Sequence, residues 1–332
     1  MRLLPPSRKN LIIIKTINKG GKKGLLKLFD KSPFLKEKNM SNNGKKNKGA
    51  LPLILPAFIL YSAVVAYPLL NMLYTSFFEW NGVYTTPYVF AGLKNYASFF
   101  QDESVHIALK NIVIIMVTSV VGIVPIGLFL ASVIQKKFFG LRFVRVSYFL
   151  PVIINKVSVG LMFTFILYPM KGPFAQIVKL FGGNEKVNVL GNMQLAIWAV
   201  AFVLIWCNVG LHMVLYSSAM AAIPDDLTES AKLDGASRRQ IFFNITLPLI
   251  GNTIQISVVL ILMNAFKIYD LVVALTGGGP GNSTEVLSTI LFKNAFYYGK
   301  FGYANAIGVI TVLISLLITV VINGVLRACR KD

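Results

Sequence analysis

Six runs of apolar residues, each about as long as a bilayer is thick, constrain this chain more than any other feature of its sequence. A helix needs roughly 20 apolar residues to cross the hydrocarbon core of a bilayer, so each run qualifies as a membrane span. The predicted spans are approximately 52–77, 111–134, 147–169, 194–219, 247–266 and 304–326. Only 14% of the residues are charged, against about a quarter in soluble domains. The sequence therefore predicts an all-α integral membrane fold with six transmembrane helices over residues 51–327 and a core of about 107–326.

The basic residues indicate how the spans are oriented. The net charge is +20, but 14 of the 33 Lys and Arg lie in residues 1–50 and most of the others lie in alternate connections. The basic side chains of those connections are Lys136, Lys137, Arg142, Arg145, Lys232, Arg238, Arg239, Arg327, Arg330 and Lys331. By the positive-inside rule these connections and both termini are cytoplasmic. Because the charge follows topology rather than a folded soluble face, it argues against nucleic acid as a partner.

The two ends of the chain are expected to be cytoplasmic tails. Residues 1–50 are rich in Lys, Asn and Gly and carry no apolar run of signal-peptide length, which predicts a disordered tail that rests on anionic membrane lipid. A helix that packs on a partner subunit is the alternative for this segment. Residues 328–332 form the second tail. Cys207, Cys329, His106 and His212 are isolated in the predicted topology, so we expect no metal site and no cofactor.

A polar block between the fourth and fifth spans, residues 223–247, reads as a helical hairpin outside the bilayer. Pro224 and the acidic residues after it are typical of a helix start, and Asp225 is a candidate cap. Gly235 stands where that helix is expected to end in a left-handed conformation. A second short helical run follows, and Pro248 precedes the next span. A membrane protein with such a hairpin is expected to use it for docking.

This block resembles the cytoplasmic coupling motif of binding-protein-dependent ABC importer permeases. The family pattern is E-A-A, three residues, G, nine residues, I, one residue, L-P, and the chain has Glu229-Ser230-Ala231, Gly235, Ile245 and Leu247-Pro248. Ser230 departs from the pattern by one small residue. Four further segments resemble the carbohydrate-uptake branch of the same family and extend the likeness over most of residues 51–327. They are 56–77, 90–100, FKIYDL at 266–271, and TGGGPGNST at 276–284 with FGYAN at 301–305.

The resemblance implies a permease subunit that performs no chemistry of its own. Its expected partners are a second permease, two cytoplasmic ATPase subunits, an extracytoplasmic solute-binding protein and a sugar or oligosaccharide, in a bacterial cell membrane. The docking helix around Glu229 would fit a cleft on the ATPase. The residues that the resemblance assigns to ATPase coupling are Glu229, Ser230, Ala231, Asp234, Gly235, Leu247 and Pro248.

Polar and aromatic residues in and beside the fourth and fifth spans are candidates for the substrate pathway. Sugars are bound by amide and hydroxyl hydrogen bonds together with aromatic contacts, and polar groups inside a membrane are costly unless they are partnered. The candidates are Trp206, Asn208, Asn264, Lys267, Tyr269 and Asp270. For each one, a bond to a neighbouring helix is the alternative, and Lys267 with Asp270 is a candidate ion pair. Lys156 either lies within the third span or reaches back to the cytoplasmic surface.

Alternative functions to an ABC importer of sugars each require a particular sequence feature. An ion-coupled secondary carrier should carry acidic residues in mid-span, and these are absent from the sequence. A sensor or scaffold should carry a soluble output domain. GGGPG at 277–281 lacks the Lys-Ser/Thr of a phosphate-binding loop and reads as a turn-rich outer loop. An ABC permease for a non-sugar solute is the nearest alternative.

Overall fold

The computed structural model describes residues 51–135 and 139–328. The chain divides into two units, Met1–Val64 and Val65–Asp332. Of the first unit, the described part comprises α3 (Leu51–Tyr61) and the beginning of the π-helical turn η1 (Ser62–Ala66). The two tails predicted at 1–50 and 328–332 lie outside the described residues, except for Ala328.

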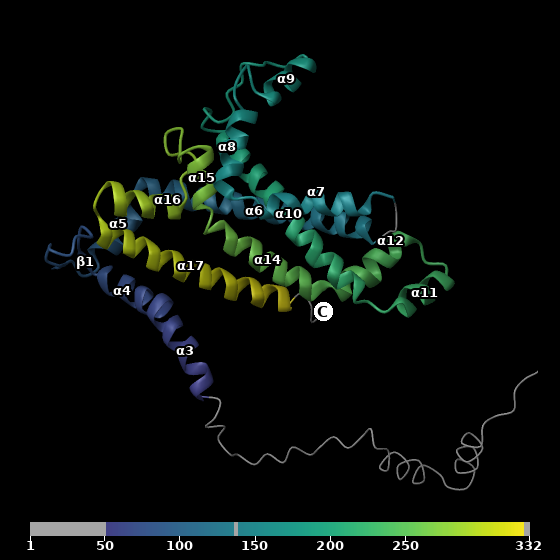
Figure 1. Cartoon of the computed structure of the whole chain (residues 1–332), viewed down its shortest axis with the longest axis horizontal. Helices are drawn as coiled ribbons and strands as arrows, with labels where there is room; N and C mark the ends of the chain where they lie inside the picture. Colours follow the sequence, from purple (N-terminus) through teal and green to yellow (C-terminus); the bar gives the residue numbers. More distant parts are fainter. Residues whose placement is uncertain (1–50, 136–138, 329–332) are drawn as a thin grey trace, which may run out of the picture. The chain divides into compact units, whose positions relative to one another are not determined.

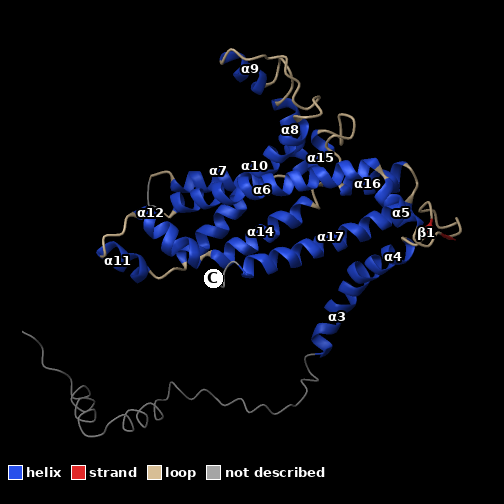
Figure 2. Ribbon diagram, turned by 180° about the vertical axis from the view of Figure 1, so that it is seen from behind, coloured by secondary structure: helices blue, strands red, loops and turns tan. Residues whose placement is uncertain are grey.

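The second unit is helical apart from one small hairpin (Figures 1 and 2). Before the docking block its elements are α4 (Tyr67–Thr75), β1 (Phe78–Glu79), β2 (Val89–Phe90), α5 (Lys94–Gln101), α6 (Glu103–Ile134), α7 (Leu141–Ile153), α8 (Lys156–Ile166), α9 (Pro173–Leu180) and α10 (Ala196–Ala221). After it come α11 (Asp225–Leu233), α12 (Arg238–Ile241), η2 (Phe242–Thr246), α13 (Leu247–Leu249), α14 (Gly251–Ala265), α15 (Tyr269–Leu275), α16 (Leu287–Phe292), η3 (Lys293–Tyr297) and α17 (Phe301–Ala328). The strands pair antiparallel, with Phe78 opposite Phe90.

Within the described residues, four helices are long and apolar enough to cross a membrane: Ile54–Thr75, Glu103–Ile134, Ala196–Ala221 and Phe301–Val325. Two bent pairs bring the number to six if each pair counts as one span. All six predicted spans therefore correspond to helical structure. The second begins eight residues earlier than expected, because Asp102 caps it by accepting a hydrogen bond from the Ser104 amide at 2.9 Å.

The predicted third span, 147–169, is not one straight helix. α7 ends at Ile153, and α8 begins at Lys156 after a bend of 104°. Ile154 is extended, and the side chain of Asn155 accepts a hydrogen bond from the Val157 amide at 2.8 Å, which starts a new helix there. Lys156 is thus the first residue of α8, and neither of the two placements considered for it anticipated a helix break.

The fifth predicted span is also broken. Arg238–Leu249 and Gly251–Ala265 meet at an angle of 68°, with Ile250 between them outside helical geometry. Pro248 has no amide hydrogen to donate within this region, which favours a bend. The chain from the docking block to α14 therefore turns before it enters the bundle.

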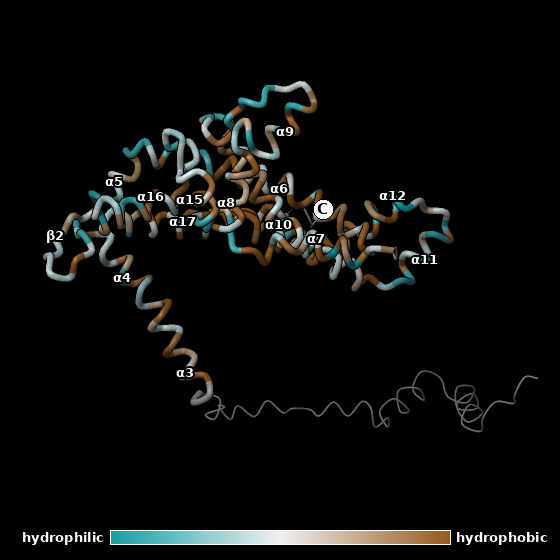
Figure 3. Tube along the Cα trace, turned by 45° about the horizontal axis from the view of Figure 1, so that its top comes forward, coloured by the Kyte–Doolittle hydropathy of each residue, from teal (hydrophilic) through white to brown (hydrophobic). Residues whose placement is uncertain are grey.

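The core lies where α6, α10, α14, α15 and α17 meet. α6 packs along α10, and its buried face includes Ile112 and Ile115, opposite Val200 and Val203 of α10. The outward face of α6 is equally apolar but exposed, as at Val117 and Val121. Figure 3 shows this hydrophobic character along the long helices and hydrophilic segments near their ends. A helix that is apolar on all sides suits a bilayer or a partner helix.

α7 approaches α10 closely at one glycine. A Cβ atom added to Gly210 would collide with the backbone carbonyl of Tyr148 in α7. Small residues at such crossings let two backbones approach within packing distance in membrane bundles. Gly210 thus fixes how the first half of the broken span lies against α10.

Candidate functional site

The docking block forms an exposed helix at one end of the second unit. Figure 1 shows α11 and α12 at the opposite end of the bundle from α5 and α16. Each of the residues from Asp225 to Ala236 is exposed or partly exposed, and Leu233 retains 89% of its surface. An amphipathic surface helix normally covers its apolar residues, so an uncovered Leu233 and a half-exposed Leu227 leave α11 with an apolar face available for contact.

The start of α11 differs in detail from the expectation. Pro224 occupies the cap position and Asp225 is the first helical residue, so Asp225 does not cap the helix. Asp225 and Asp226 still lie in the first turn, where negative charge is favourable beside the helix dipole. The Ser230 hydroxyl donates to the Asp226 carbonyl at 2.8 Å and is thereby turned back onto its own helix.

The end of α11 is set by Gly235, as predicted. Its φ of +83° is left-handed, the Gly235 amide donates to the Lys232 carbonyl at 3.0 Å, and the Ala236 amide donates to the Ala231 carbonyl at 2.9 Å. This pair of bonds is the Schellman arrangement that ends many helices. No atom lies within 4 Å of the position of a Cβ at Gly235. Glycine is therefore required there by conformation rather than by space.

The second helical run of the hairpin carries its own cap. Ser237 and Gln240 form a capping box at the start of α12, with the Ser237 amide donating to Gln240 Oε1 at 2.8 Å. α12, η2 and α13 then connect without interruption, so that Leu247 and Pro248 lie in α13, immediately before the bend at Ile250. The last two motif positions thus belong to the connection between the hairpin and α14.

Glu229 projects from this helix without a partner in the described part of the chain. The ion pairs found there are Lys94–Glu79, Lys179–Glu185 and Lys293–Glu285, and Glu229 also makes no hydrogen bond among those residues. Glu229 therefore forms no ion pair with Lys232, although the two residues are three positions apart on the same helix. Asp234 is likewise exposed. An exposed, unpaired carboxylate is well suited to bidentate bonding by an arginine of another subunit.

The six candidate pathway residues have different surroundings. Trp206 packs edge-on against Phe163 with ring centroids 5.4 Å apart, and Asn208 donates to the Leu204 carbonyl of its own helix at 2.7 Å. For these two residues the structure supports contacts between or within helices. Asn264, Lys267 and Asp270 are exposed, and the expected Lys267–Asp270 ion pair is absent from the described residues.

Tyr269 lies at the start of α15 against Phe292, with ring centroids 4.9 Å apart. Burial raises the pKa of its hydroxyl, and Tyr297 and Asp270 act in the same direction. The phenol therefore remains a neutral hydrogen-bond donor throughout the physiological range. That is the state in which it can bond to a hydroxyl group of a ligand.

His212, which is isolated in the predicted topology, lies in a buried polar network in the structure. His212 Nδ1 lies 2.7 Å from the Ser257 hydroxyl, which is also bonded to the Tyr216 hydroxyl, and all three side chains are fully buried. His212 and Tyr216 are one turn apart on α10, whereas Ser257 belongs to α14. The spacing of His212 and Tyr216 indicates that they share one face of α10. Nothing in the sequence indicates that Ser257 of α14 is their partner.

A buried carboxylate at the other end of the bundle was also missed. Glu285 is 1% exposed and bonds with Lys293 and Thr289, while its backbone carbonyl accepts from the Asn111 side chain of α6 at 2.9 Å. The glycine-rich loop 277–281 precedes it, and the Thr284 hydroxyl donates to the Gly279 carbonyl at 2.9 Å. This loop is a compact turn, and the segment after it is hydrogen-bonded to Asn111 of α6. A turn-rich loop was the structure predicted for GGGPG.

Long apolar helices with an exposed polar hairpin at one end are typical of a multi-pass membrane protein. Residues 123–331 match the family model described as "Binding-protein-dependent transport system inner membrane component". The match covers more than half of the chain, which therefore belongs to this family. Its members are transporter components in the membrane rather than enzymes.

Relatives and solved structures agree with this assignment. The chain is 36% identical to the probable ABC transporter permease protein YurN of Bacillus subtilis over 82% of this chain and 94% of that one. It is 30% identical to the multiple sugar-binding transport system permease protein MsmF of Streptococcus mutans, over 81% and 90%. A bacterial ABC transporter involved in alginate import shares the fold, with a TM-score of 0.74, 23% identity and coverage of 84% and 95%.

Proposed function

We propose that this chain is the permease subunit of an ATP-driven importer and forms part of the translocation pathway for a sugar or oligosaccharide. The family assignment and the similarity to the permease MsmF, which is named for a multiple-sugar transport system, support the substrate class. Four membrane-length helices and two bent helix pairs would supply a membrane-embedded body, and the exposed hairpin at one end would supply a connection to an energy source. The family name itself refers to a binding protein, which would deliver the substrate.

The partners and orientation follow from the same proposal. The chain pairs with a second permease, two cytoplasmic ATPase subunits and an extracytoplasmic solute-binding protein in the plasma membrane of a bacterial cell. Both termini lie in the cytoplasm with the docking hairpin. In support, Arg142 and Arg145 of α7 and Arg238 and Arg239 of α12 lie on segments near this end of the bundle, where the positive-inside rule places them in the cytoplasm.

One observation carries the coupling role: α11 is exposed, ends at a left-handed Gly235, and presents the carboxylate of Glu229, which has no partner among the residues that the structure describes. α11 inserts into a cleft of the ATPase, where Glu229 bonds to a basic side chain. ATP binding closes the ATPase dimer and moves α11. Because the hairpin is joined directly to α10 and, through α12 and α13, to α14, this motion is passed to two helices that share the buried His212–Ser257 bond.

The remaining residues assigned to coupling have supporting positions. Ala231 and Ser230 belong to the exposed helix, whereas Leu247 and Pro248 lie at the bend into α14. We assign the pathway to the region of α10, α14 and α15, with Trp206, Asn208, Asn264, Lys267, Tyr269 and Asp270 as its candidate polar and aromatic lining. Alternating access then results when the ATPase dimer closes and reopens.

The experiment that tests this function is uptake into proteoliposomes. The reconstituted importer is supplied with the binding protein, with ATP inside or absent, and with labelled xylose, sucrose or maltotriose outside. We expect uptake of at least one saccharide that needs both ATP and the binding protein. ATP-dependent uptake of an amino acid but of no saccharide would assign a non-sugar substrate, and uptake driven by an ion gradient alone would overturn the ABC mechanism.

A further inference from the structure

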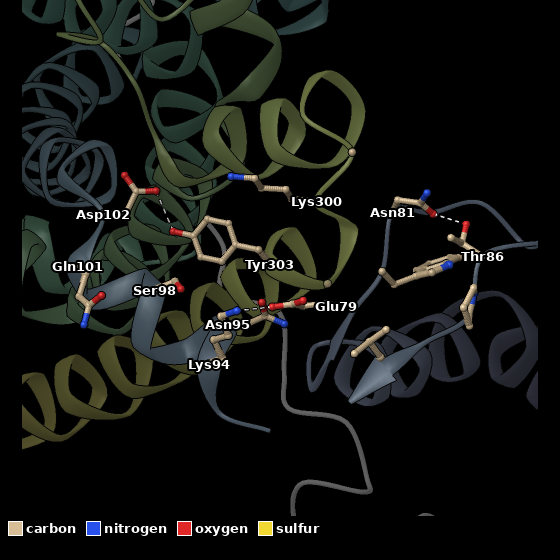
Figure 4. A pocket seen from close by; sticks show the side chains of 15 residues that line it. Glu79, Asn81, Thr86, Lys94, Asn95, Ser98, Gln101, Asp102, Lys300 and Tyr303 are labelled. Carbon is tan, nitrogen blue, oxygen red and sulfur yellow. Dashed lines mark hydrogen bonds and ion pairs between the residues drawn. The ribbon is translucent and has the colours of Figure 1, made fainter. Parts of the chain in front are cut away.

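A cavity of about 760 Å³ (Figure 4) lies beside β1 and α5, at the end of the second unit opposite the docking hairpin (Figure 1). Its walls come from the β1–β2 hairpin, from α5 with the residue that caps α6, and from the turn before α17. Figure 4 shows Asp102, Lys300 and Tyr303 grouped on one side and Asn81 with Thr86 on the other. Pockets of roughly 300–1,000 Å³ are of the size that holds small ligands.

The walls of this cavity are held in place by bonds between distant segments. The Asn95 side chain donates to the carbonyls of Ser76 and Phe78 at 2.9 and 3.0 Å. The Gly302 amide donates to the Trp80 carbonyl at 3.1 Å, and the Tyr303 hydroxyl donates to Asp102 Oδ2 at 2.9 Å. Because these bonds already order the walls of the cavity, little conformational entropy is lost when a ligand binds.

Several polar groups that line the cavity have no partner among the described residues. The amide of Gln101, the hydroxyl of Ser98 and the ammonium of Lys300 make no hydrogen bond or ion pair within residues 51–135 and 139–328. Asp102 and Glu79, by contrast, are already engaged by Tyr303 and Lys94. The unused groups are mainly donors, together with amide and hydroxyl oxygens that accept.

An aromatic ring and balanced charge complete the lining. Trp80 lines the cavity, stacked on Tyr88 at a centroid distance of 5.0 Å and braced by Phe301 at 5.6 Å. The charged lining consists of two acidic and two basic side chains, so it has no excess charge for a phosphate or a polyanion. A sugar ring offers hydroxyl groups to the amide and ammonium donors and an apolar C–H face to an indole ring.

We propose that this cavity is a binding subsite for a neutral saccharide on the extracytoplasmic face of the permease. Trp80 contacts the sugar ring, and Gln101 and Lys300 hydrogen-bond its hydroxyl groups. The subsite holds the sugar between release from the binding protein and entry into the membrane pathway. This inference rests on the proposed function and on its orientation, because the cavity lies at the end of the bundle away from the hairpin.

The test measures equilibrium binding of labelled xylose, sucrose and maltotriose to the importer complex in nanodiscs, without the binding protein. The variants are Gln101→Ala, Lys300→Ala and Trp80→Phe, which keeps an aromatic ring against Phe301. The matched control is Tyr84→Ala, because Tyr84 belongs to the same hairpin loop, is 97% exposed and does not line the cavity. Docking of the binding protein to each variant is measured in parallel.

We expect the wild-type complex to bind at least one of the three saccharides, with the dissociation constant raised roughly two- to tenfold by Gln101→Ala and by Lys300→Ala. Tyr84→Ala should match the wild type, and docking of the binding protein should be unchanged. Absence of saccharide binding by the wild-type complex would overturn the subsite. Saccharide binding that is unchanged in all variants would also overturn the subsite. A loss of binding-protein docking without a loss of saccharide binding would overturn it too, and would indicate that the cavity receives a side chain of the binding protein. If uptake into proteoliposomes persists in these cases, the proposed function stands without the subsite.

Discussion

At the scale of single residues, two buried polar clusters stabilise two different regions of the bundle. His212, Ser257 and Tyr216 join α10 to α14, and Glu285 with Lys293 and Thr289 closes the glycine-rich loop against α16. Inside a protein an unpaired polar group costs more than its hydrogen bond contributes when made. Removing one member should therefore cost more than removing a comparable exposed group.

Ser257→Ala tests the first cluster. It leaves His212 Nδ1 and the Tyr216 hydroxyl without their shared partner, and we expect a loss of stability of roughly 1–3 kcal/mol. Thermal unfolding of the purified importer measures it. Ser315→Ala is the control, because the Ser315 hydroxyl bonds only to the Val312 carbonyl of its own helix at 2.8 Å. Equal midpoints for the two variants would contradict a structural role for the network.

Lys293→Ala tests the second cluster. It leaves the carboxylate of Glu285 buried without its ammonium partner, which we expect to cost about 3 kcal/mol of stability. Adding Glu285→Gln to the same chain should recover much of that loss, because the buried charge is then gone. The same unfolding measurement applies, and Lys94→Ala provides the comparison.

Lys94 makes a surface ion pair with Glu79, with side chains that are 70% and 50% exposed. Ion pairs this exposed to solvent contribute little to stability, because water screens them. The hydrogen bond from Lys94 to Glu79 raises the pKa of Lys94 above its ordinary value of 10.5. This contribution is therefore present at neutral pH and is lost only as the pH rises through the raised pKa. A large effect of Lys94→Ala at pH 7 would contradict the contrast between the two pairs.

At the scale of elements, close helix approach and helix ends set the geometry. Gly210 lets α10 meet the backbone of α7, and Gly235 ends α11 in a conformation that other residues avoid. Neither glycine contacts a ligand in this account. Each is nevertheless required, one by space and the other by backbone angle.

Gly210→Val should displace α7 from α10. The added side chain collides with backbone rather than with a flexible side chain, so the neighbour cannot yield without moving the helix. We expect a marked loss of assembled importer, read as the yield of monodisperse complex on size-exclusion chromatography. Gly324→Val in α17 is the control, since nothing lies within 4 Å of the Cβ position there. Comparable yields would exclude a tight crossing at Gly210.

Gly235→Leu should uncouple α11 from the ATPase while leaving the bundle folded. A non-glycine residue in the left-handed region costs about 1–3 kcal/mol, which the exposed hairpin relieves by changing its path. We expect reduced saccharide uptake at an unchanged level of assembled complex. Gly251→Ala, in helical geometry with open space around it, should behave as wild type. Full uptake by Gly235→Leu would argue against a docking role for the hairpin.

At the scale of the whole molecule, the sequence predicts helical elements better than it predicts their meeting points. Apolar runs predicted the four long apolar helices and the two bent pairs, and Gly235 predicted the end of α11, because length and backbone chemistry are local properties. The break before Asn155 was missed because an Asn cap inside an apolar run looks like a single polar residue in a span. The cavity around Trp80, Gln101 and Lys300 was missed because it joins segments about 200 residues apart, and no local pattern encodes that contact.

The two ends of the second unit carry different features. The docking hairpin lies at one end of the bundle and the saccharide cavity at the other, with α6 and α17 running between the two regions (Figure 1). The proposed importer needs this separation, since energy arrives from the cytoplasm and the substrate from outside. Two of the helical pairs that connect these ends are bent, near Ile154 and near Ile250.

If α11 transmits ATPase motion through Glu229, the loss of this carboxylate should weaken the coupling of ATP hydrolysis to the binding protein. ATP hydrolysis by the reconstituted importer is followed with and without saccharide-loaded binding protein, for the wild type, for Glu229→Ala and for Glu103→Ala, an exposed acid at the other end of the bundle. The account predicts strong stimulation of the wild type and of Glu103→Ala, and a stimulation several-fold weaker for Glu229→Ala with normal assembly. Undiminished stimulation of Glu229→Ala would contradict it.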